Sequence, residues 1–200
     1  QGDRMNTRRK LIVALGAAAL ASPLTPHAQP QTKIWRVGFL YLLSRESAMD
    51  TGRYSPFLEG MRELGYVEGK NLIIERRFAD GKLERLPDLA LELVKLKVDV
   101  ILTAGTAASS AAQKATTTIP IVLANASDPV GSGLVKSLAH PGGNITGLSS
   151  LTTDISPKFL EMLQSIVPKL SRVALMIDPG NRSHTATRKS VEAAAQRTGI

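Results

Sequence analysis

The residues best suited to chemistry in this chain are small and polar, and they follow predicted buried strands. In open parallel sheets, ligands bind beyond the carboxyl ends of the strands, where loops lead into helix N-termini. Hydroxyl, amide and carboxylate groups at these positions suit the binding of a polar solute. The candidate ligand-binding residues are Ser44, Gly105, Thr106, Ser127, Asp128, Ser149, Ser150 and Asn181.

Gly105 and Thr106 carry the most information among these candidates, because they stand at a predicted helix start. A glycine followed by small residues exposes backbone N–H groups, and the helix dipole favours an anion such as a carboxylate there. Hydroxyls of Thr106 and Ser109 could add donors. The alternative is an ordinary strand-to-helix turn in which Thr106 is the N-cap.

The other candidates also have plain structural alternatives. Asp128 could accept from a ligand ammonium group, or cap the helix expected behind Pro129. Ser149 and Ser150 could contact a ligand or belong to a polar linker, and Asn181 could be a turn residue. The sequence alone leaves these alternatives open.

Signatures of catalysis and of metal binding are missing from the sequence. Gly147-Leu148-Ser149-Ser150-Leu151 lacks the second glycine of a nucleophile elbow, and no H-E-x-x-H or G-x-x-x-x-G-K-[ST] motif occurs. There is no cysteine, and the three histidines are not spaced as a metal pair. We therefore expect a binding protein that has no cofactor and is not an enzyme.

The net charge of +8 does not indicate nucleic-acid binding. The basic residues are interleaved with Asp and Glu and lack the stacking aromatics of a nucleic-acid groove. Four of them lie within the first ten residues, before an apolar run at 11–21. This layout is typical of a secretory signal, with Met5 as the start and cleavage near Ala28. Arg8-Arg9 fits a Sec or a twin-arginine signal equally, and either route predicts a periplasmic protein.

Short apolar runs alternate with amphipathic periods along the rest of the chain, which predicts an α/β fold with a parallel sheet and helices on both faces. Polar residues 44–52 are expected to form a loop, and Ser156-Pro157 and Ser183 to begin helices. A short helix is expected from Asp128-Pro129. The expected strands cover 34–41, 71–78, 98–103, 119–124, 145–148 and 172–178, and the expected helices between them cover 55–65, 86–96 and 106–114.

The domain organisation follows from this pattern. Residues 1–28 are expected to hold upstream residues and the signal, 29–33 a linker, 34–148 an N-terminal lobe and 149–200 the start of a C-terminal lobe. One strand and two helices cannot cover both faces of a second sheet. We therefore expect the second lobe to be truncated.

Four segments together resemble the ABC-transporter substrate-binding proteins of the TrpX-like group: 35–40, 57–71, 128–135 and 140–147. The resemblance implies a type I periplasmic-binding-protein fold of two α/β lobes, with the ligand in the cleft between them. It implies a small-molecule ligand such as an amino acid, a permease partner in the inner membrane and a monomer. Gly105-Thr106 would meet the ligand carboxylate, with Ser127-Asp128 and Ser149-Ser150 lining the cleft.

The function expected is thus capture of a small polar solute for an ABC importer, with a hinge near 147–153 that closes the cleft. One alternative is the ligand-sensing domain of a regulator. It would need a DNA-binding segment where the export signal stands. The other alternative is an exported α/β enzyme, for which no nucleophile or base is visible.

Overall fold

The computed structural model describes residues 33–50, 52, 54–150, 152–167 and 169–200. The expected export signal, the cleavage point near Ala28 and residues 29–32 of the expected linker lie outside these residues. The strands are β1 (Trp35–Tyr41), β2 (Leu72–Phe78), β3 (Val100–Ala104), β4 (Ile121–Ser127) and β5 (Ile145–Ser150). The helices are α2 (Arg45–Asp50), α3 (Tyr54–Glu63), α4 (Leu86–Lys95), α5 (Thr106–Ala115), α6 (Thr152–Ile166) and α7 (Arg182–Thr198), and the 3-10 turn η1 (Leu83–Arg85) precedes α4.

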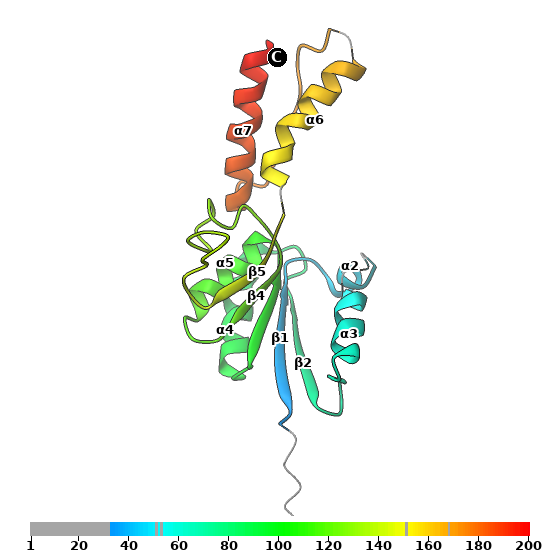
Figure 1. Cartoon of the computed structure of the whole chain (residues 1–200), viewed down its shortest axis with the longest axis vertical. Coiled ribbons are helices and arrows are strands. Elements are labelled where there is room, and N and C mark those ends of the chain that lie inside the picture. The colour runs from blue at the N-terminus through cyan, green and yellow to red at the C-terminus, as the bar shows by residue number, and fades with distance from the viewer. Residues whose placement is uncertain (1–32, 51, 53, 151, 168) are drawn as a thin grey trace, which may run out of the picture. The chain divides into compact units, whose positions relative to one another are not determined.

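The five strands form one parallel sheet in the order β2-β1-β3-β4-β5, as the alternating pattern predicts. All of the carboxyl ends therefore meet at one edge of the sheet. Helices lie on both faces: α4 and α5 on one, α3 on the other (Figure 1). This is the layered α/β architecture that the sequence predicts.

Each face of the sheet has its own apolar cluster. On one face, α4 and α5 pack onto Leu40, Ile101 and Ile121, which are fully buried. On the other face, α2 and α3 pack onto alternating residues of β1 and β3, such as Phe39 and Leu102. Because successive side chains of a strand point to opposite faces, buried β1 contributes to both clusters. The two-sided burial explains its nearly continuous apolar sequence.

Three predicted elements differ from the structure in the N-terminal part and at the start of α6. Residues 45–50, expected as loop, form α2, because Ser44 Oγ accepts from the Ser47 N–H and caps its first turn. The short helix expected after Asp128-Pro129 is a set of turns, with Asp128 in the left-handed region at φ 44°. The helix expected from Ser156 begins at Thr152, and the Ser156 hydroxyl donates to the Thr152 carbonyl.

The strand expected over 172–178 is wrong. These residues form no strand, and Met176 is 98% exposed. An apolar run becomes a strand only when a neighbouring strand supplies hydrogen-bond partners, and the described part of the chain places none beside it. In contrast, the helix expected from Ser183 is confirmed as α7, although its N-cap is Asn181 and not Ser183 as expected.

Candidate functional site

The carboxyl ends of β3, β4 and β5 are tied together by hydrogen bonds between candidate residues. The Gly105 N–H donates to the Asn125 carbonyl at 2.7 Å. The Thr106 hydroxyl donates to the Ser127 carbonyl at 3.2 Å, and the hydroxyls of Ser127 and Ser150 lie 3.0 Å apart. The structure therefore brings Gly105, Thr106, Ser127 and Ser150 together at one edge, as the topology of parallel strands requires.

The N-terminus of α5 stands at this edge without a side-chain cap. Gly105 is its N-cap, at φ 89°, where a side chain would be strained. Thr106 is therefore not the N-cap, and its hydroxyl and that of Ser109 are not free donors, because they bond the carbonyls of Ser127 and Gly105. What remains for an anion is the set of first-turn backbone N–H groups, which have no partner within a helix.

A bulge in β4 shapes the same edge. Thr103 pairs with Leu123 but Ala104 pairs with Asn125, so β4 advances two residues while β3 advances one. The pairing with β5 shows the same extra residue in β4 between Leu123 and Ala126. As a result Ala124 and Asn125, although consecutive, both line one cavity. Bulges near binding sites commonly redirect a side chain in this way.

The cavity has a volume of about 540 Å³ and lies over the sheet face that α3 covers. Polar side chains at the ends of β4 and β5 line one part of it, namely Asn125, Ser149 and Ser150. The remainder is mainly apolar and aromatic. The lining residues are Phe39, Tyr41, Ala48, Tyr54, Pro56, Phe57, Leu102, Ala104, Ala124, Asn125, Leu148, Ser149 and Ser150.

Aromatic rings form the inner part of the cavity. Phe39 contacts Tyr54 edge-on with ring centroids 5.0 Å apart, and Phe57 lies 6.0 Å from Tyr54. Tyr54 is only 2% exposed. Burial raises the pKa of its hydroxyl above the ordinary value, while Arg76 acts in the opposite direction. The Tyr54 phenol therefore stays neutral, and its ring contributes an apolar surface.

Six of the eight candidates do not line the cavity: Gly105, Thr106 and Ser127 belong to the hydrogen-bonded edge beside it, and Ser44, Asp128 and Asn181 have local structural roles. Ser44 caps α2, and its hydroxyl also lies 3.5 Å from Glu46. Asp128 accepts from the Gly131 N–H at 2.8 Å within a turn, so it caps no helix, because the helix expected behind Pro129 does not form. Asn181 accepts from the N–H and the hydroxyl of Ser183 at the start of α7.

Sequence reasoning missed Asn125 and the aromatic residues. Asn125 was expected after a strand ending at 124, whereas β4 continues to Ser127. The aromatic residues belong to different elements, β1 and α3, so no local spacing joins them. Their signal was the continuous apolar run of β1 and the apolar face of α3, which predict a core but not a cavity.

No group of three or more His, Cys, Asp or Glu side chains among the described residues could hold a metal ion. No helix in this part of the chain is both long and apolar enough to cross a membrane.

Comparison with known proteins assigns the family. The family model described as ABC transporter substrate binding protein matches residues 37–200. The chain belongs to this family. This substrate-binding protein is 35% identical over 121 residues to a tyrosine-binding protein of Clostridioides difficile, an alignment covering 60% of this chain and 34% of that relative.

Solved structures agree with the assignment. A conserved domain protein from Vibrio cholerae is 32% identical to this chain with a TM-score of 0.76, and the match covers 84% of this chain and 55% of the Vibrio chain. The ABC domain in complex with L-Trp from Streptococcus pneumonia, 23% identical with a TM-score of 0.72, covers 83% and 55% and shares the fold. An open, ligand-free substrate-binding protein from Clostridium difficile is 27% identical, with a TM-score of 0.60 and coverage of 84% and 55%.

These comparisons confirm the resemblance to the TrpX-like group and the type I periplasmic-binding-protein fold. The family is one of solute-binding proteins rather than enzymes. The chain spans about half the length of these solved chains and about a third of the curated relative.

Proposed function

We propose that this protein captures an amino acid for an ABC importer, and that the carboxyl edge of its sheet forms one wall of the ligand cleft. Family membership supports the transport role, and the tyrosine-binding relative supports an amino-acid ligand. The whole protein is proposed to act in the periplasm, as a monomer that docks on an inner-membrane permease. Residues 34–148 are proposed as one lobe and 149–200 as the start of the other.

The observation that carries the proposal is the exposure and the free hydrogen-bonding capacity of the Asn125 side chain. Its side chain is exposed in the cavity, and its amide makes no hydrogen bond within the described part of the chain. The bulge in β4 places this amide on the side of the aromatic rings instead of the α5 side. An amide offers both donors and an acceptor, so it can bind an ammonium or a carboxylate group.

The neighbouring groups suit the parts of an amino acid. Ala104 lines the cavity and leads directly into Gly105 and the uncapped start of α5, where backbone N–H groups favour a carboxylate. The hydroxyls of Ser149 and Ser150 lie at the same edge and can accept from an ammonium group. The aromatic interior suits an apolar or ring-bearing side chain. A hinge near residues 147–153 would close the second lobe over the ligand.

Titration calorimetry of the natural full-length protein with the common amino acids tests the proposal. We expect at least one to bind, and Asn125→Ala to weaken it about 10- to 100-fold, because a hydrogen bond to a charged group contributes about 1.5–3 kcal/mol. The melting temperature of this variant should stay near that of the wild type, because the amide has no hydrogen-bond partner among the described residues.

Asn181→Ala is the matched control. Its amide oxygen caps α7, and loss of this cap should lower the free energy of unfolding by about 1 kcal/mol. The variant should therefore melt at a lower temperature than the wild type but bind the amino acid with unchanged affinity. Failure of every amino acid to bind or to shift the melting temperature would contradict the proposal. So would wild-type affinity in Asn125→Ala.

A further inference from the structure

Tyr54, which lines the cavity, is hydrogen-bonded to a residue that does not line it. Arg76 lies on edge strand β2 and does not line the cavity. Its Nε donates to the Tyr54 hydroxyl at 2.5 Å, and its guanidinium carbon lies 5.3 Å from the Tyr54 ring centroid. The hydroxyl of this lining residue is therefore committed to a group beyond the lining.

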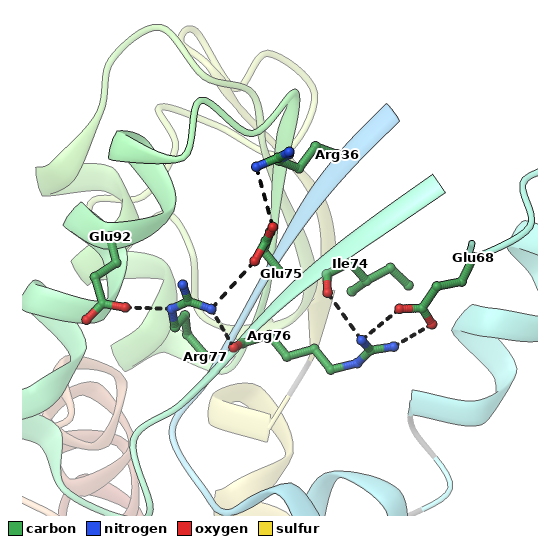
Figure 2. Close-up of polar contacts among 7 residues, drawn as sticks. All are labelled: Arg36, Glu68, Ile74, Glu75, Arg76, Arg77 and Glu92. Atoms are coloured by element: carbon green, nitrogen blue, oxygen red, sulfur yellow. Dashed lines mark hydrogen bonds and ion pairs between the residues drawn. The ribbon is translucent and has the colours of Figure 1, made fainter. Parts of the chain in front are cut away.

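The guanidinium of Arg76 is itself fixed at every nitrogen. Its two terminal nitrogens bond the two carboxylate oxygens of Glu68 at 2.8 and 2.6 Å, and one of them also donates to the Ile74 carbonyl at 3.2 Å (Figure 2). Fork-to-fork pairs of this kind restrict orientation as well as distance. The hydrogen bond from Arg76 lowers the pKa of Glu68, so the carboxylate stays charged at neutral pH.

We propose that Arg76, oriented by Glu68, is a positioning residue that sets the Tyr54 ring as the aromatic wall of the ligand site. The inference rests on the proposed function. With its hydroxyl bonded to Arg76, Tyr54 presents ring carbons to the cavity and stays edge-on to Phe39. Arg76 then influences the affinity for a ring-bearing amino acid without touching it.

The next residue of β2 provides a matched control. Arg77 points to the opposite side of the strand, where its Nε donates to Glu92 at 2.6 Å and its Nη1 lies 3.8 Å from Glu75 (Figure 2). Removing Arg77 changes the net charge of β2 as much as removing Arg76 does. It leaves the Tyr54 hydroxyl bonded.

The binding test uses L-tyrosine and L-alanine with the natural full-length protein. We expect Arg76→Met and Tyr54→Phe each to lower L-tyrosine affinity about tenfold, because the ring is no longer held in place by the part-buried hydrogen bond between them, and the double variant to lose no more than either. Affinity for L-alanine, whose methyl group does not reach the rings, should change less than twofold. Arg77→Met should bind both as the wild type does. Additive losses, or equal losses for the two amino acids, would overturn the proposal.

A second measurement needs no ligand and separates this inference from the proposed function. With ¹³C-labelled tyrosine, the Tyr54 ring signals, assigned by their loss in Tyr54→Phe, should shift and broaden in Arg76→Met and stay unchanged in Arg77→Met. Unchanged Tyr54 signals in Arg76→Met would overturn the positioning role. If the rings respond but neither amino acid binds to the wild type, the proposed ligand class fails while the positioning of Tyr54 by Arg76 stands.

Discussion

Replacing Gly147 by alanine perturbs β5 at a point where the backbone leaves no space. Gly147 has φ 135°, a region that L side chains rarely adopt. An added Cβ would lie 2.3 Å from the Leu123 carbonyl oxygen, 2.5 Å from its nitrogen and 2.8 Å from its Cα. Leu123 is the pairing partner of Gly147 on β4, so the clash is with backbone and no side-chain rotation relieves it.

Two contributions determine the size of the effect. A non-glycine residue held in this backbone region costs about 1–3 kcal/mol. Relief of the clash requires β4 and β5 to separate, which removes at least one net hydrogen bond of about 1 kcal/mol. We therefore expect Gly147→Ala to lower the free energy of unfolding by about 3 kcal/mol. For a domain of this size, that corresponds to a melting temperature about 6–12 °C lower.

Thermal unfolding followed by circular dichroism measures the effect, with Gly60→Ala as the control. Gly60 lies within α3, and an added Cβ there meets nothing within 4 Å. Alanine in a helix interior is favoured over glycine by about 0.5–1 kcal/mol, so this variant should melt slightly later than the wild type. A Gly147→Ala protein that melts within about 1 °C of the wild type would refute the geometry described for β5.

Two further predictions concern buried and charged groups. Thr103 and Ser109 are both fully buried, and their hydroxyls lie 2.8 Å apart. Ser109→Ala leaves the Thr103 hydroxyl unpaired, so it should lower the free energy of unfolding by about 1–3 kcal/mol, as measured by urea unfolding. Adding Thr103→Val removes the unpaired hydroxyl and should recover part of this loss. Hydrogen bonds from the Lys33 ammonium and the Arg36 N–H lower the pKa of Asp99 below its ordinary value of 3.8, so its stabilisation is present above that pH and is lost as the pH falls through the lowered value. Asp99→Asn should therefore be less stable than the wild type at pH 7, by less than about 1 kcal/mol because the carboxylate is largely solvated, and the difference should shrink as the pH falls through the lowered pKa; a constant difference across the acid titration would contradict this.

Much of the fold could be predicted because most strands and helices have a local pattern of apolar residues that can be recognised in the sequence. The strand at 34–41 and the helix at 86–96 were predicted to within two residues of β1 and α4. Helix α2 was not predictable in this way, because its six residues are too few to show a period. Residues 172–178 failed for the opposite reason: their apolar run is correct for a strand, but pairing depends on a neighbour that no local pattern reveals.

The candidate site was predictable in outline only. Polar residues after strands indicated the correct edge, and Ser149 and Ser150 line the cavity. The sequence could not show that the Thr106 hydroxyl donates to the Ser127 carbonyl, because that bond joins the start of α5 to the end of β4, 21 residues further along the chain. Nor could it show which way Asn125 points, since this depends on one unpaired residue in β4.

That unpaired residue makes the two halves of β4 follow different alternations. Ile121 and Leu123 face α5, and after the bulge the same face is taken by Ala126 rather than by Asn125. Loss of the single codon for Ala124 would leave a regular strand in which Asn125 directly follows Leu123, so Asn125 would keep its place on the cavity side and Ala126 its place beneath α5. In lineages with this sheet, a shortening by one codon at this point would therefore remove the bulge and one lining residue while the polar amide keeps its orientation, and a substitution at Ala124 would alter only the lining.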